Sequence, residues 1–355
     1  MDGYTSFLRP LLFCLDAETA HRLAHRVMAT GFPWGLMGDR LFVRDDRLHV
    51  NVAGLKLANP VGIAPGLDKN GLATRSLQQF GFGYVFVGSI LPEPRTGNPR
   101  PRVRRLVEQE SMINCYGLPS DGLEVCAARL RKVRPRTTKV FANFDALTLR
   151  DYLRSYEVLQ PLVDAVELST RCPNNVDDDG EFYEPMHFEH LLREITRRKR
   201  KPLFLKMVPW ENEKEKQNRL DLVERALHYG VDGFTIPGTW NQADPKLSLG
   251  RGHISGRMAF TKTLDVVQSM YAVVGNRAII KALGGISNGQ EAFAAIAAGA
   301  TLVELLTAFI YQGWTTAFRI NRELAERMSA DGWTSIEALR GAGARMRPAE
   351  LADQV

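Results

Sequence analysis

The sequence has little cysteine and no long apolar run, and both absences narrow its function. Its 355 residues include four cysteines, Cys14, Cys115, Cys126 and Cys172, and no two of them form a Cys-x-x-Cys pair. This spacing suggests neither a zinc site nor a disulfide framework, so we expect no bound metal. No window approaches the ~20 apolar residues of a membrane-spanning helix. Acidic residues interrupt the N-terminal apolar positions, so there is no cleavable signal pattern, and we expect a cytoplasmic protein.

The charge balance is mildly basic. The formal net charge is +6, and 45% of the residues are hydrophobic, which is ordinary for a globular protein. A small basic excess fits a phosphorylated cofactor, an acidic metabolite or an anionic membrane surface. The densest basic run, residues 197–201, closes an amphipathic helical pattern that begins near His187, where the helix dipole favours cations. We therefore expect no nucleic-acid partner.

Short apolar runs alternate with helical patterns from about residue 55 to residue 328. Most runs are almost continuously apolar, as expected for parallel strands that are covered on both faces. Eight such units predict a (β/α)8 TIM barrel, with a doubly wound sheet as the alternative. The predicted strands are 61–64, 84–89, 140–143, 165–169, 202–207, 233–236, 278–283 and 302–307.

The chain divides into three parts. Residues 46–330 form the predicted barrel, and residues 331–355 form a C-terminal tail. In residues 1–45, apolar positions recur at helical spacing, which predicts two short amphipathic helices. One interpretation is a cap packed on the barrel. The other is a hood that lies at a membrane surface and admits a lipid-like acceptor.

Several loops at the predicted barrel mouth carry polar groups suited to a cofactor, because reacting groups of such barrels follow the strands. Lys69 lies in a glycine-rich loop after the first strand, although such loops are often plain turns. Lys206 ends the fifth strand, where it would stabilise negative charge on a reduced flavin or, alternatively, pair with a surface neighbour. The loops after strands seven and eight suit a phosphate, which Gly284, Gly285, Thr307 and Ala308 would bind through backbone N–H groups.

Cys172 lies in a polar loop after the fourth strand and is a candidate acid or base. Arg171 would lower its pKa if the guanidinium turned inward, whereas a lone cysteine is more often a small buried hydrophobe. Asn114, Asn143 and Asn174 could hydrogen-bond a heterocycle or the flavin edge, or serve as turn residues.

Several motifs together resemble the dihydroorotate dehydrogenase family over about residues 4–325. They are residues 15–21, 59–71, 81–83, 99–102, 113–117, 255–257 and 284–286. The first is similar to the N-terminal region of the membrane-associated, quinone-using class. The resemblance implies FMN at the C-terminal mouth of a (β/α)8 barrel. In this chemistry a base removes a substrate proton, hydride passes to flavin N5, and a quinone or another acceptor reoxidises the flavin.

The resemblance also assigns roles to individual residues. Cys172, Lys69 and Glu167 are the catalytic candidates, and Lys69, Asn114 and Asn174 the substrate-binding candidates. The expected flavin contacts, the phosphate donors included, are Ala64, Gly66, Ser89, Asn143, Lys206, Ser255, Gly256, Gly284, Gly285, Thr307 and Ala308.

The chain departs from the family pattern around the substrate. Glu167 replaces an asparagine, two extra residues precede Cys172, and Ile236-Pro237-Gly238 stands where the family has Thr-Asn-Thr. Residues 177–181 are acidic. These changes remove hydrogen-bond donors and add carboxylates, which would weaken binding of the orotate anion.

We therefore expect an FMN oxidoreductase that acts on CH–CH or CH–NH groups of another small substrate, heterocyclic or derived from an amino acid. Three alternatives stay open: a genuine dihydroorotate dehydrogenase with a quinone acceptor, a non-catalytic FMN-binding paralogue, and a phosphosugar isomerase or aldolase barrel. Peripheral contact with the inner face of a membrane, through the N-terminal helices, is a further expectation. The oligomeric state is open.

Overall fold

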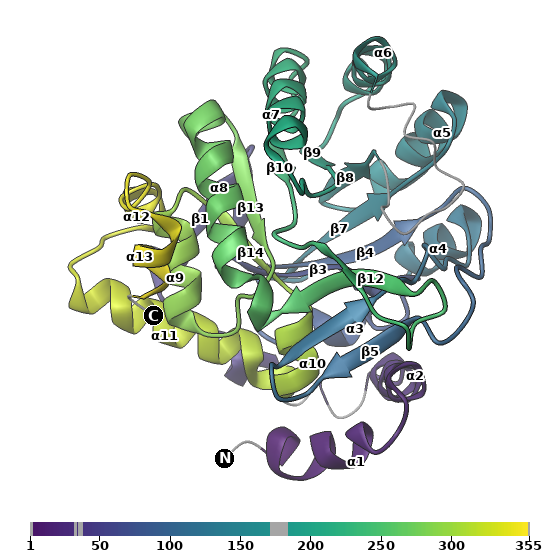
Figure 1. Cartoon of the computed structure of the whole chain (residues 1–355), viewed down its shortest axis with the longest axis vertical. Helices are drawn as coiled ribbons and strands as arrows, with labels where there is room; N and C mark the ends of the chain where they lie inside the picture. The colour runs from purple at the N-terminus through teal and green to yellow at the C-terminus, as the bar shows by residue number, and fades with distance from the viewer. Residues whose placement is uncertain (1–2, 32–33, 35–37, 171–183, 354–355) are drawn as a thin grey trace.

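The computed structural model describes residues 3–31, 34, 38–170 and 184–353. Eight parallel strands close into a barrel (Figure 1), which confirms the predicted (β/α)8 fold and rules out the doubly wound sheet. Around the barrel the strands are β3 (Val61–Asp68), β4 (Tyr84–Ile90), β7 (Lys139–Phe144), β8 (Ala165–Ser169), β9 (Leu203–Lys206), β10 (Gly233–Thr235), β13 (Ile279–Leu283) and β14 (Leu302–Leu305), which pairs with β3.

Helices surround the barrel and cover the outer faces of its strands (Figure 1). After β3 to β9 they are α3 (Thr74–Leu77), α4 (Leu123–Leu130), α5 (Leu149–Leu159), α6 (Pro185–Thr196) and α7 (Glu213–His228). The later helices are α8 (Phe260–Val274), α9 (Gly289–Ala297), α10 (Thr307–Gln312), α11 (Thr316–Ala330), α12 (Ile336–Leu339) and α13 (Pro348–Ala352). Asn212 and Asn288 accept from the third backbone N–H of α7 and α9, which fixes where these helices begin.

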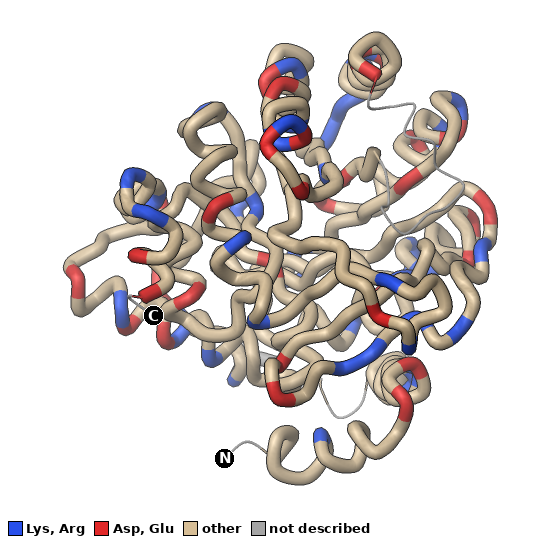
Figure 2. The backbone as a smooth tube through the Cα atoms, viewed as in Figure 1, with Lys and Arg blue, Asp and Glu red and all other residues tan. Residues whose placement is uncertain are grey.

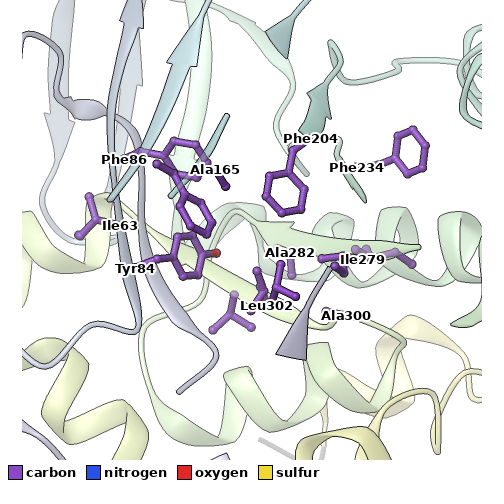
Figure 3. Close-up of a cluster of buried hydrophobic side chains, with 14 of the residues drawn as sticks. Ile63, Tyr84, Phe86, Ala165, Phe204, Phe234, Ile279, Ala282, Ala300 and Leu302 are labelled. Carbon is purple, nitrogen blue, oxygen red and sulfur yellow. The ribbon is translucent and has the colours of Figure 1, made fainter. Parts of the chain in front are cut away.

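Aromatic side chains fill much of the barrel interior (Figure 3). The rings of Tyr84 and Phe141 stack with centroids 4.8 Å apart, and those of Phe141 and Phe204 lie 5.7 Å apart. Phe86 meets Phe141 edge to face at 5.4 Å. All four side chains are fully buried, so this packing fixes the spacing of the strands below the barrel mouth.

A four-stranded antiparallel sheet stands beside the mouth of the barrel and was not predicted from the sequence. Its order is β11 (Asn241–Ala243), β12 (Arg251–Gly256), β6 (Ser111–Asn114) and β5 (Val103–Leu106). Strands β5 and β6 follow barrel strand β4, and β11 and β12 follow β10. His253 of β12 pairs with Asn114 of β6, so the segment that follows β4 and the segment that follows β10 meet in this sheet. A hairpin of β1 (Val50–Val52) and β2 (Leu55–Leu57) precedes the barrel.

The N-terminal segment forms a π-helical turn, η1 (Tyr4–Leu8), followed by α1 (Arg9–Phe13) and α2 (Ala17–Ala29). Asp16 caps α2 by accepting from the Thr19 N–H at 3.0 Å. These helices lie outside the barrel, α2 against β5 and η1 against α10 (Figure 1). Figure 2 shows few charged residues on α1. In the described ranges no helix has the length and apolar character that crossing a bilayer requires.

Candidate functional site

A cavity of about 540 Å³ lies at the C-terminal ends of the barrel strands, between the antiparallel sheet and the N-terminal helices. Its outer end is apolar and is lined by Leu8, Leu12, Leu23, Ala24, Val27 and Met28 of those helices. Its inner end is formed by barrel strands and the loops that follow them. One continuous space therefore connects the N-terminal helices with the barrel mouth.

Most of the residues predicted from the sequence line this cavity. They are Ala64, Gly66, Lys69, Ser89, Asn114, Lys206, Ser255, Gly256, Gly284, Gly285, Thr307 and Ala308. Asn143 and Glu167 lie beneath the cavity, in the barrel interior. The predicted acid or base, Cys172, and the predicted substrate contact, Asn174, lie outside the described residues.

The loops after β13 and β14 form one wall of the inner end. Gly284 and Gly285 have φ angles of 131° and 78°, which residues with a side chain rarely adopt. A Cβ on Gly285 would lie 2.3 Å from the backbone nitrogen of Phe260, so only glycine lets the loop pass this close to α8. Beside the loops, the hydroxyls of Ser255 and Thr307 are 2.9 Å apart. This wall offers backbone N–H groups and two hydroxyls to an anionic ligand.

Lys69 is a partly buried cation on another wall. Its ammonium donates to the Gly66 carbonyl at 2.6 Å and lies 4.5 Å from the centre of the Tyr116 ring. Burial, helped by the nearby Arg102 guanidinium, lowers the pKa of Lys69 to about 8, although Glu18 opposes the shift. An anion bound against Lys69 would offset this desolvation and hold the proton on the amine.

Strand register explains why polar groups gather under the cavity. In parallel pairs, Ser169 lies opposite Lys206, Lys206 opposite Thr235, and Thr235 opposite Lys281. Residues paired across neighbouring strands point to the same face. These four residues therefore form a polar layer around the upper end of the barrel, above the aromatic layer.

Lys281 joins two carboxylates inside this layer. Its ammonium contacts Glu167 Oε2 directly and lies 3.0 Å from Glu304 Oε1, and all three side chains are fully buried. The rings of Phe86 and Phe204 face the same ammonium at 4.4 Å and 4.7 Å. We call Glu167, Lys281 and Glu304 the buried triad.

The two carboxylates of the buried triad have different surroundings. Glu167 also accepts from Thr235 Oγ1 at 2.9 Å and from Asn143 Nδ2 at 2.8 Å. Burial pushes the pKa of Glu167 upward, but the charges of Lys281 and Lys206 and these hydrogen bonds outweigh burial, so the net pKa lies below the usual value. For Glu304, burial outweighs the charge of Lys281, and the pKa is raised.

This placement corrects two expectations about Glu167. Both of its oxygens are hydrogen-bonded inside the barrel and the residue does not line the cavity, so it is not positioned to act as an acid or base on a substrate. Its charge is also balanced by Lys281. The argument that this carboxylate repels an anionic substrate loses its basis in direct contact, because Glu167 lies beneath the cavity against Lys281.

Sequence reasoning missed the importance of Lys281 and Glu304. Each interrupts an otherwise apolar strand, within Ile279–Leu283 and Leu302–Leu305, which is the signal that could have identified them. Two histidines were also missed. His21 and His25 of α2 line the cavity with ring centroids 4.2 Å apart, one helical turn from each other.

Comparisons with known proteins are consistent along the whole chain. The family model described as dihydroorotate dehydrogenase matches residues 47–328. The chain is 34% identical to the dihydroorotate dehydrogenase (quinone) of Rhodospirillum rubrum, over 95% of this chain and 94% of that one. It is 33% identical to the mitochondrial dihydroorotate dehydrogenase (quinone) of Mus musculus, over 94% and 88%. A crystal structure of DHODH from Eimeria tenella in complex with ferulenol aligns with a TM-score of 0.82 and 28% identity, over 93% of this chain and 96% of that one.

Replacing Lys281 by methionine should destabilise the fold strongly. The substitution keeps the length of the side chain but leaves two buried carboxylates without their cation, which typically costs about 3–5 kcal/mol. Urea denaturation would measure the loss. Adding Glu167→Gln and Glu304→Gln to the Lys281→Met variant should restore much of the stability.

Lys199→Met is the matched control, because Lys199 pairs with Asp232 at 2.7 Å in a partly exposed position. It should cost about 1 kcal/mol or less. A Lys281→Met variant as stable as this control would show that the buried triad does not depend on its charge.

His253 should make stability depend on pH. Burial lowers its pKa from 6.5 to about 4, whereas the unfolded chain keeps the ordinary value. Below pH 6.5 the unfolded state therefore binds a proton that the folded state does not, and stability falls by up to about 1.4 kcal/mol per pH unit down to about pH 4. Urea midpoints of the wild type and His253→Gln should diverge in this window and run parallel above it. His228→Gln, on the exposed face of α7, is the control and should follow the wild type throughout.

Proposed function

The chain belongs to the dihydroorotate dehydrogenase family, and from this premise we propose that it oxidises dihydroorotate to orotate with FMN as cofactor and a quinone as acceptor. It is an oxidoreductase of the type that acts on CH–CH groups. The observation that carries the proposal is one continuous cavity whose inner end is lined by glycine loops, hydroxyls and two lysines and whose outer end is apolar.

The inner end of the cavity fits FMN. Gly284, Gly285 and Thr307 would hold its phosphate through backbone N–H groups, as the glycine geometry and the adjacent Ser255 hydroxyl support. Lys206 lines the floor and would stabilise negative charge on the ring. FMN, when bound, would supply the hydride acceptor.

The charges of the cavity suit an anionic substrate. Lys69 and Lys206 both line it, Glu167 is paired with Lys281 beneath it, and Glu304, which also lines it, contacts the same ammonium. A substrate carboxylate bound to Lys69 would replace the interactions with water that the amine loses on burial. This balance supports dihydroorotate, whose carboxylate would need a cation.

The outer end suits a lipid-like acceptor. The helices that line it expose Phe7 by 75% and Leu11 by 69%, with Leu8, Leu15, Leu23 and Val27 also exposed. Apolar side chains on the outer face of two amphipathic helices favour a membrane surface, from which a quinone would enter between them.

The base is proposed to be Cys172, which follows the buried end of β8 by three residues. Reacting groups of such barrels come from the loops that follow the strands, which is why a residue after the fourth barrel strand is proposed as the proton acceptor.

A second candidate is a related oxidation of another small substrate. Glu167 is committed to Lys281, and Pro237, which lines the cavity, has no amide to offer. Two hydrogen-bonding groups of the family pattern are thereby lost. A site that lacks designed polar partners discriminates less well for its original substrate.

The visible spectrum separates these candidates. Purified protein supplied with FMN should show flavin absorption, lose it on anaerobic addition of dihydroorotate, and regain it when a quinone is added. Bound flavin that dihydroorotate leaves oxidised, but that another CH–CH donor bleaches, would establish the second candidate. Protein that takes up no FMN would refute the cofactor assignment.

Replacing Cys172 by alanine should slow this bleaching about 100-fold or more, because a positioned base contributes about 10² to 10⁴ in rate. Stopped-flow absorbance under anaerobic conditions would measure it. Cys126→Ala is the matched control: this thiol is buried in α4, outside the cavity, and burial raises its pKa to about 12. Bleaching of Cys172→Ala as fast as that of the wild type would rule out Cys172 as the base.

A further inference from the structure

Glu304 has one carboxyl oxygen that the described residues leave without a hydrogen-bond partner. Its Oε1 lies 3.0 Å from the Lys281 ammonium and accepts from the Tyr84 hydroxyl at 3.3 Å. Its Oε2 is fully buried and has no partner in the described ranges. Buried oxygens are rarely left in this state, because desolvation without a compensating hydrogen bond costs free energy.

Glu304 is also the one member of the buried triad that lines the cavity. It lies on β14, two residues before Leu306 and three before Thr307, which line the same space. Glu167 and Lys281 are sealed beneath it. A change of charge in the inner end of the cavity therefore acts on Glu304 more directly than on its partners.

Charged and titratable groups face Glu304 from four other strands. Lys281 approaches from β13, Glu167 from β8, Lys206 from β9 and Tyr84 from β4. Glu167 has the direct contact with Lys281 and two more donors, which hold it ionised. Glu304 has the longer contact and an oxygen without a donor. Of the two carboxylates, Glu304 is therefore the one that can gain a proton at least cost.

We propose that Glu304 is a positioning residue of the cofactor site that takes up one proton when negative charge arrives in the cavity and releases it when that charge leaves. The proposal rests on the proposed flavin function. FMN, when bound, would accept two electrons and one proton as a hydride from the substrate, and Lys206 would then face one extra negative charge. One proton then moves from solvent to Glu304 and forms an O–H bond, so the total charge of the cavity and its floor is unchanged. Reoxidation returns the proton to solvent.

Without this uptake, an added charge would have to be carried in a region of low dielectric above an ionised carboxylate. Protonation of Glu304 removes that repulsion and leaves Lys281 paired with Glu167. The buried triad would thus adjust its charge without breaking its closest contact. The consequence is a flavin midpoint potential that depends on pH through Glu304.

The test is the midpoint potential of the FMN-loaded protein, measured against reference dyes from pH 5.5 to 9.5 in the absence of substrate. Glu304→Gln keeps the shape of the side chain but cannot ionise. In part of this range the wild type should bind one proton more per two electrons than the variant. The midpoint potential of the wild type should therefore fall more steeply with rising pH than that of the variant. The two slopes should differ by about 30 mV per pH unit, the value for one proton per two electrons.

Glu291→Gln is the matched control, because Glu291 is another buried carboxyl whose pKa is raised by burial, but it does not line the cavity. Its slope should equal that of the wild type. Equal slopes for the wild type and Glu304→Gln at every pH would overturn the proposal, even if dihydroorotate still bleached the flavin. Absence of bound FMN would instead refute the proposed function.

A second measurement needs no variant. The reduced-minus-oxidised infrared spectrum of the wild type should contain a carboxylic-acid C=O band that appears on reduction and shifts in D₂O. Its absence throughout the pH range would also overturn the proposal, so the inference stays testable if Glu304→Gln fails to fold.

Discussion

The contact between Glu167 and Lys281 is the constraint on which the barrel mouth depends. It connects β8 with β13 across the interior and buries both charges completely. Such charges are tolerated only when they are paired and hydrogen-bonded, so the contact fixes its neighbours as well. Asn143 and Thr235 each donate to Glu167, and Tyr84 reaches the same network through Glu304. The polar floor of the cavity is therefore a rigid layer laid on the aromatic layer below it.

This layer also determines the electrostatics of the site. If Glu167 were unpaired, its charge would oppose the cations that line the cavity. Paired with Lys281 beneath the cavity, Glu167 does not line it, whereas Lys69, Lys206 and Glu304 do. The inner end offers glycine loops, hydroxyls and cations, while the outer end is lined mainly by apolar side chains of the N-terminal helices.

Much of the fold could be predicted from the sequence, because strands such as Tyr84–Ile90 are continuously apolar and are followed by helical patterns. Gly284, Gly285 and Lys206 could be placed at the barrel mouth from the sequence, because they follow or end barrel strands, and all three line the cavity. The antiparallel sheet was missed because Val103–Leu106 is half-buried and carries two arginines, so it reads as loop. The buried triad was missed for another reason: Glu167 and Lys281 are 114 residues apart, and only barrel closure brings them together.

The pairing of Glu167 with a lysine from a distant strand changes how the departures from the family pattern should be interpreted. Taken alone, Glu167 in place of an asparagine suggests a change in the substrate, because an amide is replaced by a charge. Inside a barrel the same replacement is costly unless a cation is supplied, and Lys281 supplies it from another strand. Glu167 and Lys281 therefore form one structural unit, whose first effect is on the floor of the site. The replacement at Pro237 is different, because this residue lines the cavity and takes no part in the buried triad. Of the two changed positions, only Pro237 lines the cavity.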